Sequence, residues 1–204
     1  TYSAAISFAD EDATPEKLHI KSKVTDANGT SYAIRDIKSV AYKDSLKLVK
    51  IEEGITSMAG GAWKTGYADS DTVTISFPST LEDVEDGFLN WDKHPDSVIV
   101  PKWLSKMKPE NGVVYAGKVA VYVPSAAEET GAAKETAITF KDGCTKIAHK
   151  ALFKNTDVEK VNIPASVKAI GGAAFAGCTE LSQVNFAADA QIEDLGWRAF
   201  YDCT

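Results

Sequence analysis

Apolar residues recur along this chain in short groups that alternate with polar residues and are followed by a turn. The clearest group is Val161-Asn162-Ile163-Pro164, in which the two apolar side chains lie two positions apart. A period of two is typical of a β-strand with one buried face. Single apolar anchors follow at Ile170 and Phe175, so we expect a strand, a turn and a return of the chain to the same interior.

The same template recurs 23 residues before and 23 residues after this group. Upstream, the strand and anchor positions hold Ile138, Phe140, Ile147 and Leu152. Downstream, they hold Val184 and Phe186 and, after a two-residue insertion, Leu195 and Phe200. Three consecutive units therefore share one pattern of inward-facing residues.

The N-terminal half carries more divergent copies of the template. One copy holds Val49, Ile51, Ile55, Met58, Ala62 and Trp63, and the next holds Ile75, Phe77, Pro78, Leu81, Val84 and Leu89. A further unit opens at Val98, Val100 and Pro101 and then departs from the pattern, while Ile37, Ala41 and Tyr42 match the tail of an earlier one.

One unit of this length cannot enclose its own apolar face, whereas stacked units bury a continuous core. The period falls within the range of roughly 20–29 residues that is typical of leucine-rich repeats. The predicted architecture is therefore a β-rich α/β solenoid of ~23-residue leucine-rich repeats, with only short helical or 3₁₀ turns around the Ala-Phe segment.

The amino-acid sequence of the repeat resembles that of a known protein family. The run from Val161 to Leu181, with Ile-Pro-x-Ser-Val followed by Phe-x-x-Cys, resembles the BspA-like leucine-rich repeats of bacterial surface proteins. The resemblance is close over 138–204 and weaker over about 32–101. Asn111–Val119, leading to Lys141–Ala148, resembles the interruption that such proteins often carry.

Two hairpins are predicted outside the repeats. Leu18–Val24 alternates and is expected to pair with Thr30–Ile34 across Asp26–Gly29, because Asn-Gly between alternating runs is a strong hairpin signal. We expect this N-terminal hairpin to cap the first repeat. Val113–Tyr115 and Val119–Val123 form the second candidate, an inserted hairpin.

The predicted organisation has four parts along one continuous solenoid. They are an N-terminal strand and hairpin cap (1–31), degenerate repeats (32–101), an inserted helix or hairpin with a loop (102–137) and regular BspA-like repeats (138–204). The chain stops where the next unit would begin its strand, so we expect either a continuing parent chain or a protected end. It has no initiator Met and no leader, which fits either processing or a boundary imposed on the sequence.

Composition narrows the class of partner. Among 204 residues there are 22 Lys and Arg against 29 Asp and Glu, giving a net charge of −7. This balance disfavours a phosphate backbone as the main partner, so no nucleic acid is expected. No run approaches the ~18 apolar residues of a membrane span, so no membrane insertion of this segment is expected.

Candidate chemistry is sparse, and we expect no catalytic residue, no cofactor and no metal. His19, His94 and His149 adjoin no nucleophile motif. Cys178 and Cys203 share one repeat position with Asn155, which favours a buried ladder contacting backbone turns over a disulfide or zinc site.

Other polar motifs have structural interpretations. The acidic groups Glu52-Glu53 and 82–86 are interpreted as a solvated face, although paired carboxylates also occur in glycosidases and calcium sites. Gly60-Gly61 and Gly171-Gly172 are interpreted as tight turns. The sequon at Asn28-Gly29-Thr30 is explained by its hairpin.

Candidate binding residues are the strand centres, which should point away from the core and stack into a polar ribbon. Trp197 joins them because it replaces a glycine of the template and because Trp is enriched at interfaces. The predicted ligand-binding residues are Lys50, Ser76, Ile99, Thr139, Asn162, Asn185 and Trp197. Trp91 and Trp103 lie on either side of the point where the repeat pattern breaks down. Two interpretations are open for them, an interface with a partner and packing against the inserted hairpin.

The predicted function is binding without catalysis. The resemblance implies an extracellular or cell-surface bacterial protein that adheres to a protein or glycan ligand on host or neighbouring cells. A spacer that presents another module is the alternative, and a hydrolase using Glu82 or Glu85 is the remote one.

Overall fold

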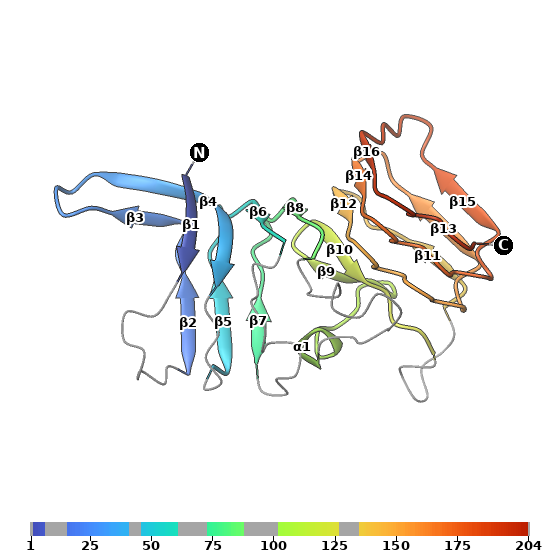
Figure 1. Ribbon diagram of the computed structural model, residues 1–204, viewed down its shortest axis with the longest axis horizontal. Helices are drawn as coiled ribbons and strands as arrows, with labels where there is room; N and C mark the ends of the chain where they lie inside the picture. The colour runs from blue at the N-terminus through green and yellow to red at the C-terminus, as the bar shows by residue number, and fades with distance from the viewer. Residues whose placement is uncertain are drawn as a thin grey trace. The chain divides into compact units, whose positions relative to one another are not determined.

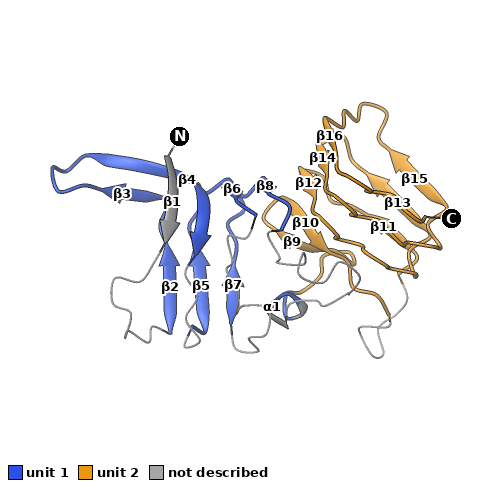
Figure 2. Ribbon diagram, in the orientation of Figure 1, with its two compact units in different colours: residues 1–107 blue, residues 108–204 orange. Residues whose placement is uncertain are grey.

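The computed structural model describes residues 2–6, 16–40, 46–60, 73–87, 102–126 and 135–203. The chain divides into two compact units, unit 1 (residues 1–107) and unit 2 (residues 108–204), coloured separately in Figure 2. The boundary falls inside the predicted 102–137 insert, and the four-part division of the chain stays a prediction.

Unit 1 is built from two ladders of short parallel strands (Figure 1). Its elements are β1 (Tyr2–Ile6), β2 (Lys17–Ile20), β3 (Lys23–Thr25), β4 (Ser31–Val40), β5 (Leu48–Ile51), β6 (Ser57–Met58), β7 (Thr74–Ser76), β8 (Asp83–Val84) and the short helix α1 (Lys102–Ser105). One ladder has the order β2-β5-β7 and the other the order β1-β4-β6-β8, with β3 paired to β4. The strands that the divergent copies predicted therefore stack as rungs.

Strand register confirms the apolar template in unit 1. Val49 pairs with Ile75 across β5 and β7, and Met58 pairs with both Ile37 and Val84 in the second ladder. All five side chains are buried. The alternation seen in the sequence thus places equivalent residues next to one another in space.

The predicted N-terminal hairpin is only partly correct. β3 pairs antiparallel with β4, and Asp26 Oδ1 accepts the N–H groups of Asn28 and Thr30 at 2.9 Å to hold the turn. Leu18 and Ile20, however, belong to β2, which pairs in parallel with β5. The expected single strand divides because Ile20 is buried toward the core, whereas the residues after it leave the ladder. The capping role of the hairpin stays a prediction.

Unit 2 repeats the two-ladder arrangement with more regular spacing. Its strands are β9 (Val114–Ala116), β10 (Val119–Tyr122), β11 (Ala137–Thr139), β12 (Lys146–Ile147), β13 (Lys160–Ile163), β14 (Ala169–Ile170), β15 (Gln183–Phe186) and β16 (Asp194–Leu195). The sheets have the orders β11-β13-β15 and β16-β14-β12-β10-β9. The inserted hairpin β9–β10 is confirmed, and its strand β10 joins the second ladder beside β12.

The predicted column of strand residues in unit 2 is confirmed. Val161 pairs with Ile138 on one side and with Val184 on the other, and Ile163 pairs with Phe186. The backbone N–H of Phe140 donates to the carbonyl of Asn162 at 3.1 Å, which places Phe140 beside the same rung. The repeat is therefore a leucine-rich-repeat solenoid, rich in β-structure, and the described residues contain a single four-residue helix.

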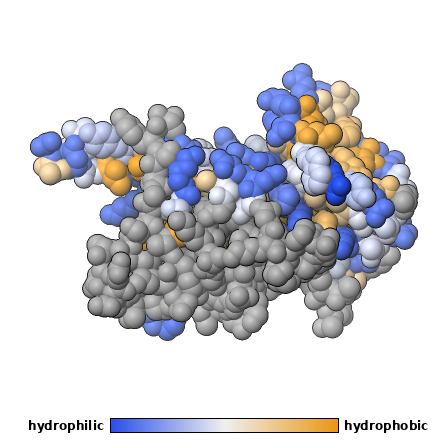
Figure 3. All heavy atoms as spheres, viewed as in Figure 1, coloured by the Kyte–Doolittle hydropathy of each residue, from blue (hydrophilic) through white to orange (hydrophobic). Residues whose placement is uncertain are grey.

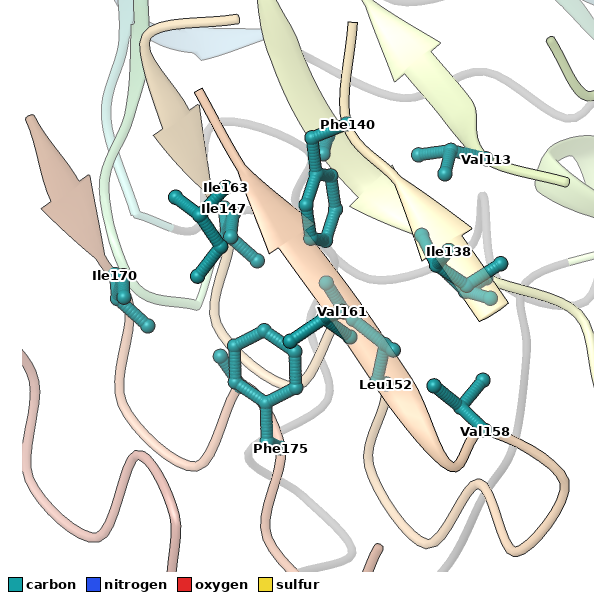
Figure 4. Packing of buried hydrophobic residues seen from close by; sticks show 14 of the residues in the cluster. Val113, Ile138, Phe140, Ile147, Leu152, Val158, Val161, Ile163, Ile170 and Phe175 are labelled. Carbon is teal, nitrogen blue, oxygen red and sulfur yellow. The ribbon is translucent and has the colours of Figure 1, made fainter. Parts of the chain in front are cut away.

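Phenylalanine anchors fill the interior of unit 2 (Figure 4). The ring of Phe175 meets that of Phe140 edge to face at 6.4 Å and stacks on that of Phe200 at 4.8 Å. Phe140 and Phe175 are almost fully buried. Burial of apolar surface is the main favourable free-energy term of folding, and each of these rings contributes roughly 2–3 kcal/mol to it.

Glycine is required at Gly171 by space, in addition to the turn that begins at the Gly171-Gly172 pair as predicted. A Cβ at this position would lie 2.4 Å from the backbone nitrogen of His149 in the preceding rung. Gly196 meets the backbone of Gly171 and Gly172 in the same way, at 2.2 Å from the nearest atom. At Gly171 and Gly196 the neighbouring rung therefore leaves no room for a side chain. Gly61 lies outside the described residues.

We predict that Gly171→Ala lowers the free energy of unfolding by about 3 kcal/mol, because a backbone clash must be relieved by moving a rung. Gly143→Ala is the matched control. Gly143 has a φ of +80°, but a methyl group added there would meet no atom within 4 Å, so only the left-handed backbone penalty of about 1 kcal/mol applies. Urea unfolding followed by circular dichroism measures both, and equal losses would contradict the close-approach explanation.

Candidate ligand-binding surface

Polar side chains form a hydrogen-bonded row on the outer face of the β11-β13-β15 sheet. Asn162 Nδ2 donates to Thr139 Oγ1 at 2.9 Å, and Asn185 Nδ2 donates to Asn162 Oδ1 at 2.9 Å. Gln183 Nε2 extends the row by donating to Asn185 Oδ1 at 3.1 Å. We call these four residues the amide row.

The amide row faces outward because it alternates with buried strand residues. Thr139 lies between buried Ile138 and Phe140, and Asn162 lies between buried Val161 and Ile163. Parallel pairing in register then brings equivalent side chains into one line. Three of the predicted binding residues are therefore neighbours.

The chemistry of the amide row suits recognition. A carboxamide has two N–H donors and an oxygen with two lone pairs, and each bond along the row occupies one of these. The remaining donors and lone pairs are directed by their neighbours, which reduces the entropy lost when a ligand binds. The row carries no charge.

The other predicted binding residues lie elsewhere. In unit 1, Lys50 pairs in register with His19 and Ser76 on the β2-β5-β7 ladder, and all three are exposed. Trp197 lies in the turn after β16, outside the sheet that carries the amide row. Ile99 lies outside the described residues.

The acidic pair Glu52-Glu53 lies at the surface, Glu53 exposed and Glu52 partly so, and both carboxylates also join neighbouring rungs. Glu53 accepts the N–H of Ser79 at 2.9 Å, the hydroxyl of Ser79 at 3.0 Å and the N–H of Thr80 at 3.2 Å. Glu52 accepts the N–H of Ser22 at 2.9 Å and lies 3.1 Å from Nε2 of His19.

These bonds shift the titration of both carboxyl groups. The N–H of Ser79 is the main cause that lowers the pKa of Glu53, and the N–H of Ser22 is the main cause for Glu52. In the second acidic group, Glu85 accepts the N–H of Gly60 at 3.0 Å. The carboxylates therefore stabilise turns between rungs.

Because the pKa of Glu53 is lower in the folded state, its stabilisation is present above the unfolded value of 4.5 and is lost as the pH falls through the folded value. We predict that Glu53→Gln lowers the melting temperature at neutral pH and weakens the loss of stability on acidification below 4.5. Thermal melts across this range measure the effect. The exposed Glu180→Gln variant is the control, and identical pH profiles for the Glu53 variant and the parent chain would contradict the role.

The cysteine ladder is confirmed. Cys178 Sγ donates to the carbonyl of Leu152 at 3.0 Å, and Cys203 Sγ donates to that of Phe175 at 3.1 Å. One rung earlier, Asn155 Nδ2 donates to the carbonyl of Val123 at 3.2 Å. Thiol and amide thus satisfy the same kind of backbone acceptor in successive turns.

Burial controls the reactivity of the thiols. It raises the pKa of Cys178 to about 12 and that of Cys144 to about 11, and it also raises the pKa of Cys203, which is less buried. Among the described residues, no three or more His, Cys, Asp and Glu side chains form a group that fits a metal ion.

We predict that a disulfide reagent at mildly alkaline pH labels Cys203 in the folded chain and labels Cys144 and Cys178 only after unfolding. The thiolate is the nucleophile, and full burial disfavours it. Peptide mapping after labelling identifies the modified sites, with the Cys203→Ser variant as the control. Rapid labelling of Cys178 in the folded state would contradict the ladder.

The tryptophans divide between core and surface. Trp103 on α1 is only 3% exposed and packs against Phe77 with ring centroids 5.9 Å apart, so packing is its role. Trp197 is 74% exposed, and the Arg198 guanidinium lies over its ring at 4.1 Å. The sequence analysis did not identify Arg198 as a surface residue of interest. The signal is a cation three residues before an aromatic residue, which occurs at Arg198 and Tyr201 as it does at Lys150 and Phe153. Trp63 and Trp91 lie outside the described residues.

The other two histidines are His149 and His94. His149 lies in the turn after β12 and is half-buried, and His94 lies outside the described residues. In the part of the chain that the structure describes, no helix has the length and apolar character needed to cross a bilayer.

Comparison with known sequences gives one family. Residues 131–204 match the model described as "BspA type Leucine rich repeat region (6 copies)". No curated protein sequence matches the chain.

Comparison with solved structures gives bacterial leucine-rich-repeat proteins among the similar chains. The leucine-rich-repeat protein TpLRR of T. pallidum has a TM-score of 0.42 at 14% identity, over 94% of this chain and 79% of that one. The pneumococcal vaccine antigen PcpA has a TM-score of 0.40 at 10% identity, over 98% and 72%. A leucine rich cell surface protein of Faecalibacterium prausnitzii has a TM-score of 0.37 at 13% identity, over 87% and 71%.

Proposed function

Because residues 131–204 are a BspA-type leucine-rich-repeat region, we propose that this chain is a non-catalytic binding module of a bacterial cell-surface or secreted protein. Its ligand is a protein or glycan on a host or neighbouring cell. The amide row of unit 2 is the surface that binds it.

The observation that carries this proposal is the continuous line of side-chain hydrogen bonds on an outward, partly exposed sheet face. The bonds from Asn185 to Asn162 and from Asn162 to Thr139 align polar groups at the spacing of neighbouring strands, about 4.8 Å. Such a line costs little ordering entropy on binding. Its groups are hydrogen-bond donors and acceptors, so the amide row suits the binding of polar ligands.

We predict that Asn162→Arg weakens binding about tenfold or more, because the longer cation interrupts the row and displaces ligand groups. The chain is screened by biolayer interferometry against immobilised host matrix proteins and a glycan array. Thr156→Arg places the same side chain at an exposed turn position and is the matched control.

Two results decide the proposal. Loss of the identified ligand in Asn162→Arg and Asn185→Arg, with melting temperatures like that of Thr156→Arg, supports it. Unchanged binding in both row variants, or no ligand in the whole screen, overturns it and favours the spacer hypothesis.

A further inference from the structure

Three lysines are spaced along the outer face of the β2-β5-β7 ladder in unit 1. Lys17 pairs in register with Leu48, and two residues further along the strands His19 pairs with Lys50. Lys21 lies another two residues along the chain from His19. All three lysines are exposed. The face therefore has one lysine at each of three successive levels, and we call Lys17, Lys50 and Lys21 the lysine face.

Hydrogen bonds and charges place Glu52 beside Lys21 at the third level. The N–H of Glu52 donates to the carbonyl of Ile20 at 3.0 Å, which continues the parallel pairing of β2 with β5. The N–H of Ser22 is the main cause of the lowered pKa of Glu52, and the charges of His19 and Lys21 lower it further. Glu52 is thus the carboxylate that opposes an acidic ligand on this face.

The exposure of the lysine face comes from the direction of its side chains. Lys50 lies on the central strand, with β2 on one side and β7 on the other, and is still exposed (Figure 1). Its neighbours in the strand, Val49 and Ile51, are buried. Alternation along the strand therefore directs Lys50 out of the sheet, where stacking of rungs does not cover it.

The charges of the lysine face are available to a ligand. Of the carboxylates that the structure describes, none forms an ion pair with Lys17, Lys21 or Lys50. Lys47, which lies close in the sequence to Leu48, is instead paired with Glu16. The face therefore carries net positive charge in a chain whose net charge is −7.

The second ladder of unit 1 has a register row of the opposite character. Asp36, Ser57 and Asp83 pair across β4, β6 and β8, and this row holds no lysine or arginine. The hydroxyl of Ser57 donates to Asp36 Oδ1. The described residues over β6 and β8 are hydrophilic in Figure 3. An acidic partner is attracted by the lysine face and meets like charge at this row, which favours docking on one ladder.

The spacing of the three levels fits an extended peptide. Side chains two residues apart on a strand lie about 6.7 Å apart, and an extended peptide repeats its own side chains of one face at the same interval. An acidic residue at every second position therefore places one carboxylate at each lysine. Leu48, which is 36% exposed, and the exposed hydroxyl residues Thr74 and Ser76 supply apolar and hydrogen-bonding contacts on the same face.

We propose that the outer face of the β2-β5-β7 ladder binds an extended acidic peptide segment of a partner protein, with acidic residues at alternate positions. Lys17, Lys50 and Lys21 each bind one carboxylate. The lysine face lies in unit 1 and the amide row in unit 2, so the proposal does not rest on the function proposed for that row.

The test is isothermal titration calorimetry on the full chain, with a blocked peptide of three Glu-Thr repeats as the probe. A blocked peptide of three consecutive glutamates followed by three threonines has the same composition and charge and is the comparison ligand. We expect a Kd of about 0.1 mM for the alternating peptide in about 0.05 M NaCl, and about fivefold weaker binding of the block peptide. Raising the salt to about 0.3 M should weaken the alternating peptide about fivefold.

Variants separate the lysine face from general attraction of acids. Lys50→Gln and Lys17→Gln should each weaken the alternating peptide about fivefold, whereas Lys50→Arg should retain it. Glu52→Gln should strengthen it about threefold, because the opposing carboxylate is removed. Lys38→Gln removes an exposed lysine from β4 in the other ladder and is the matched control. Melting temperatures show that each variant is folded, and the lysine variants decide the test if Glu52→Gln unfolds.

Several results overturn the proposal. They are equal binding of the alternating and block peptides, no binding of either at low salt, unchanged binding in both folded lysine variants, and a loss in Lys38→Gln as large as that in Lys50→Gln. A heparin hexasaccharide that binds more tightly than the peptide and depends on Lys50 assigns the face to a sulfated polysaccharide instead. Loss of the peptide in Asn162→Ala, with Lys50→Gln unchanged, places it at the amide row.

Discussion

The contact between successive backbones is the constraint on which unit 2 depends. At the corner after β14 the chain passes so close to its neighbour that a Cβ on Gly171 would lie 2.4 Å from a backbone nitrogen, and Gly196 after β16 is placed in the same way. Further along the turn, the N–H of Leu152 donates to the carbonyl of Ala174 at 2.7 Å. The N–H of Phe175 donates to the carbonyl of Ala199 at 2.8 Å. Backbone hydrogen bonds therefore join the rungs at the turn as well as in both sheets, and side chains are left to fill the interior or to face outward.

This division of side chains accounts for the surface of the molecule. Inward positions stack phenylalanines, as Phe175 does between Phe140 and Phe200. Outward positions in the β11-β13-β15 sheet hold hydrogen-bonding groups in a row, and Asn162 lies between Thr139 and Asn185 in it. Changes at outward positions alter the surface without disturbing the core, which is the property that a recognition scaffold requires. The family match of residues 131–204 agrees with such a scaffold.

Polar residues near the turns act mainly on the stacking of rungs. Glu53 joins its own turn to that of Ser79 and Thr80, and the thiol of Cys178 satisfies a carbonyl of the preceding unit. Carboxylates and thiols, which are the groups found in catalytic and metal sites, thus form hydrogen bonds between rungs of the repeat. Trp197 and Arg198 differ, since their contact with each other leaves both exposed.

The sequence by itself indicated the period, the strand centres and the resemblance to BspA-like repeats, because the apolar pair Val161 and Ile163 recurs at intervals of 23 residues. It also indicated both hairpins through their Gly-containing turns. Only the tertiary structure decided that Leu18 and Ile20 form a rung, because the strand leaves the ladder where burial ends. The partners of Glu53 and the stacking of Arg198 on Trp197 were likewise decided there. Local pattern encodes which face a residue takes, whereas its partner depends on which rung stacks against it.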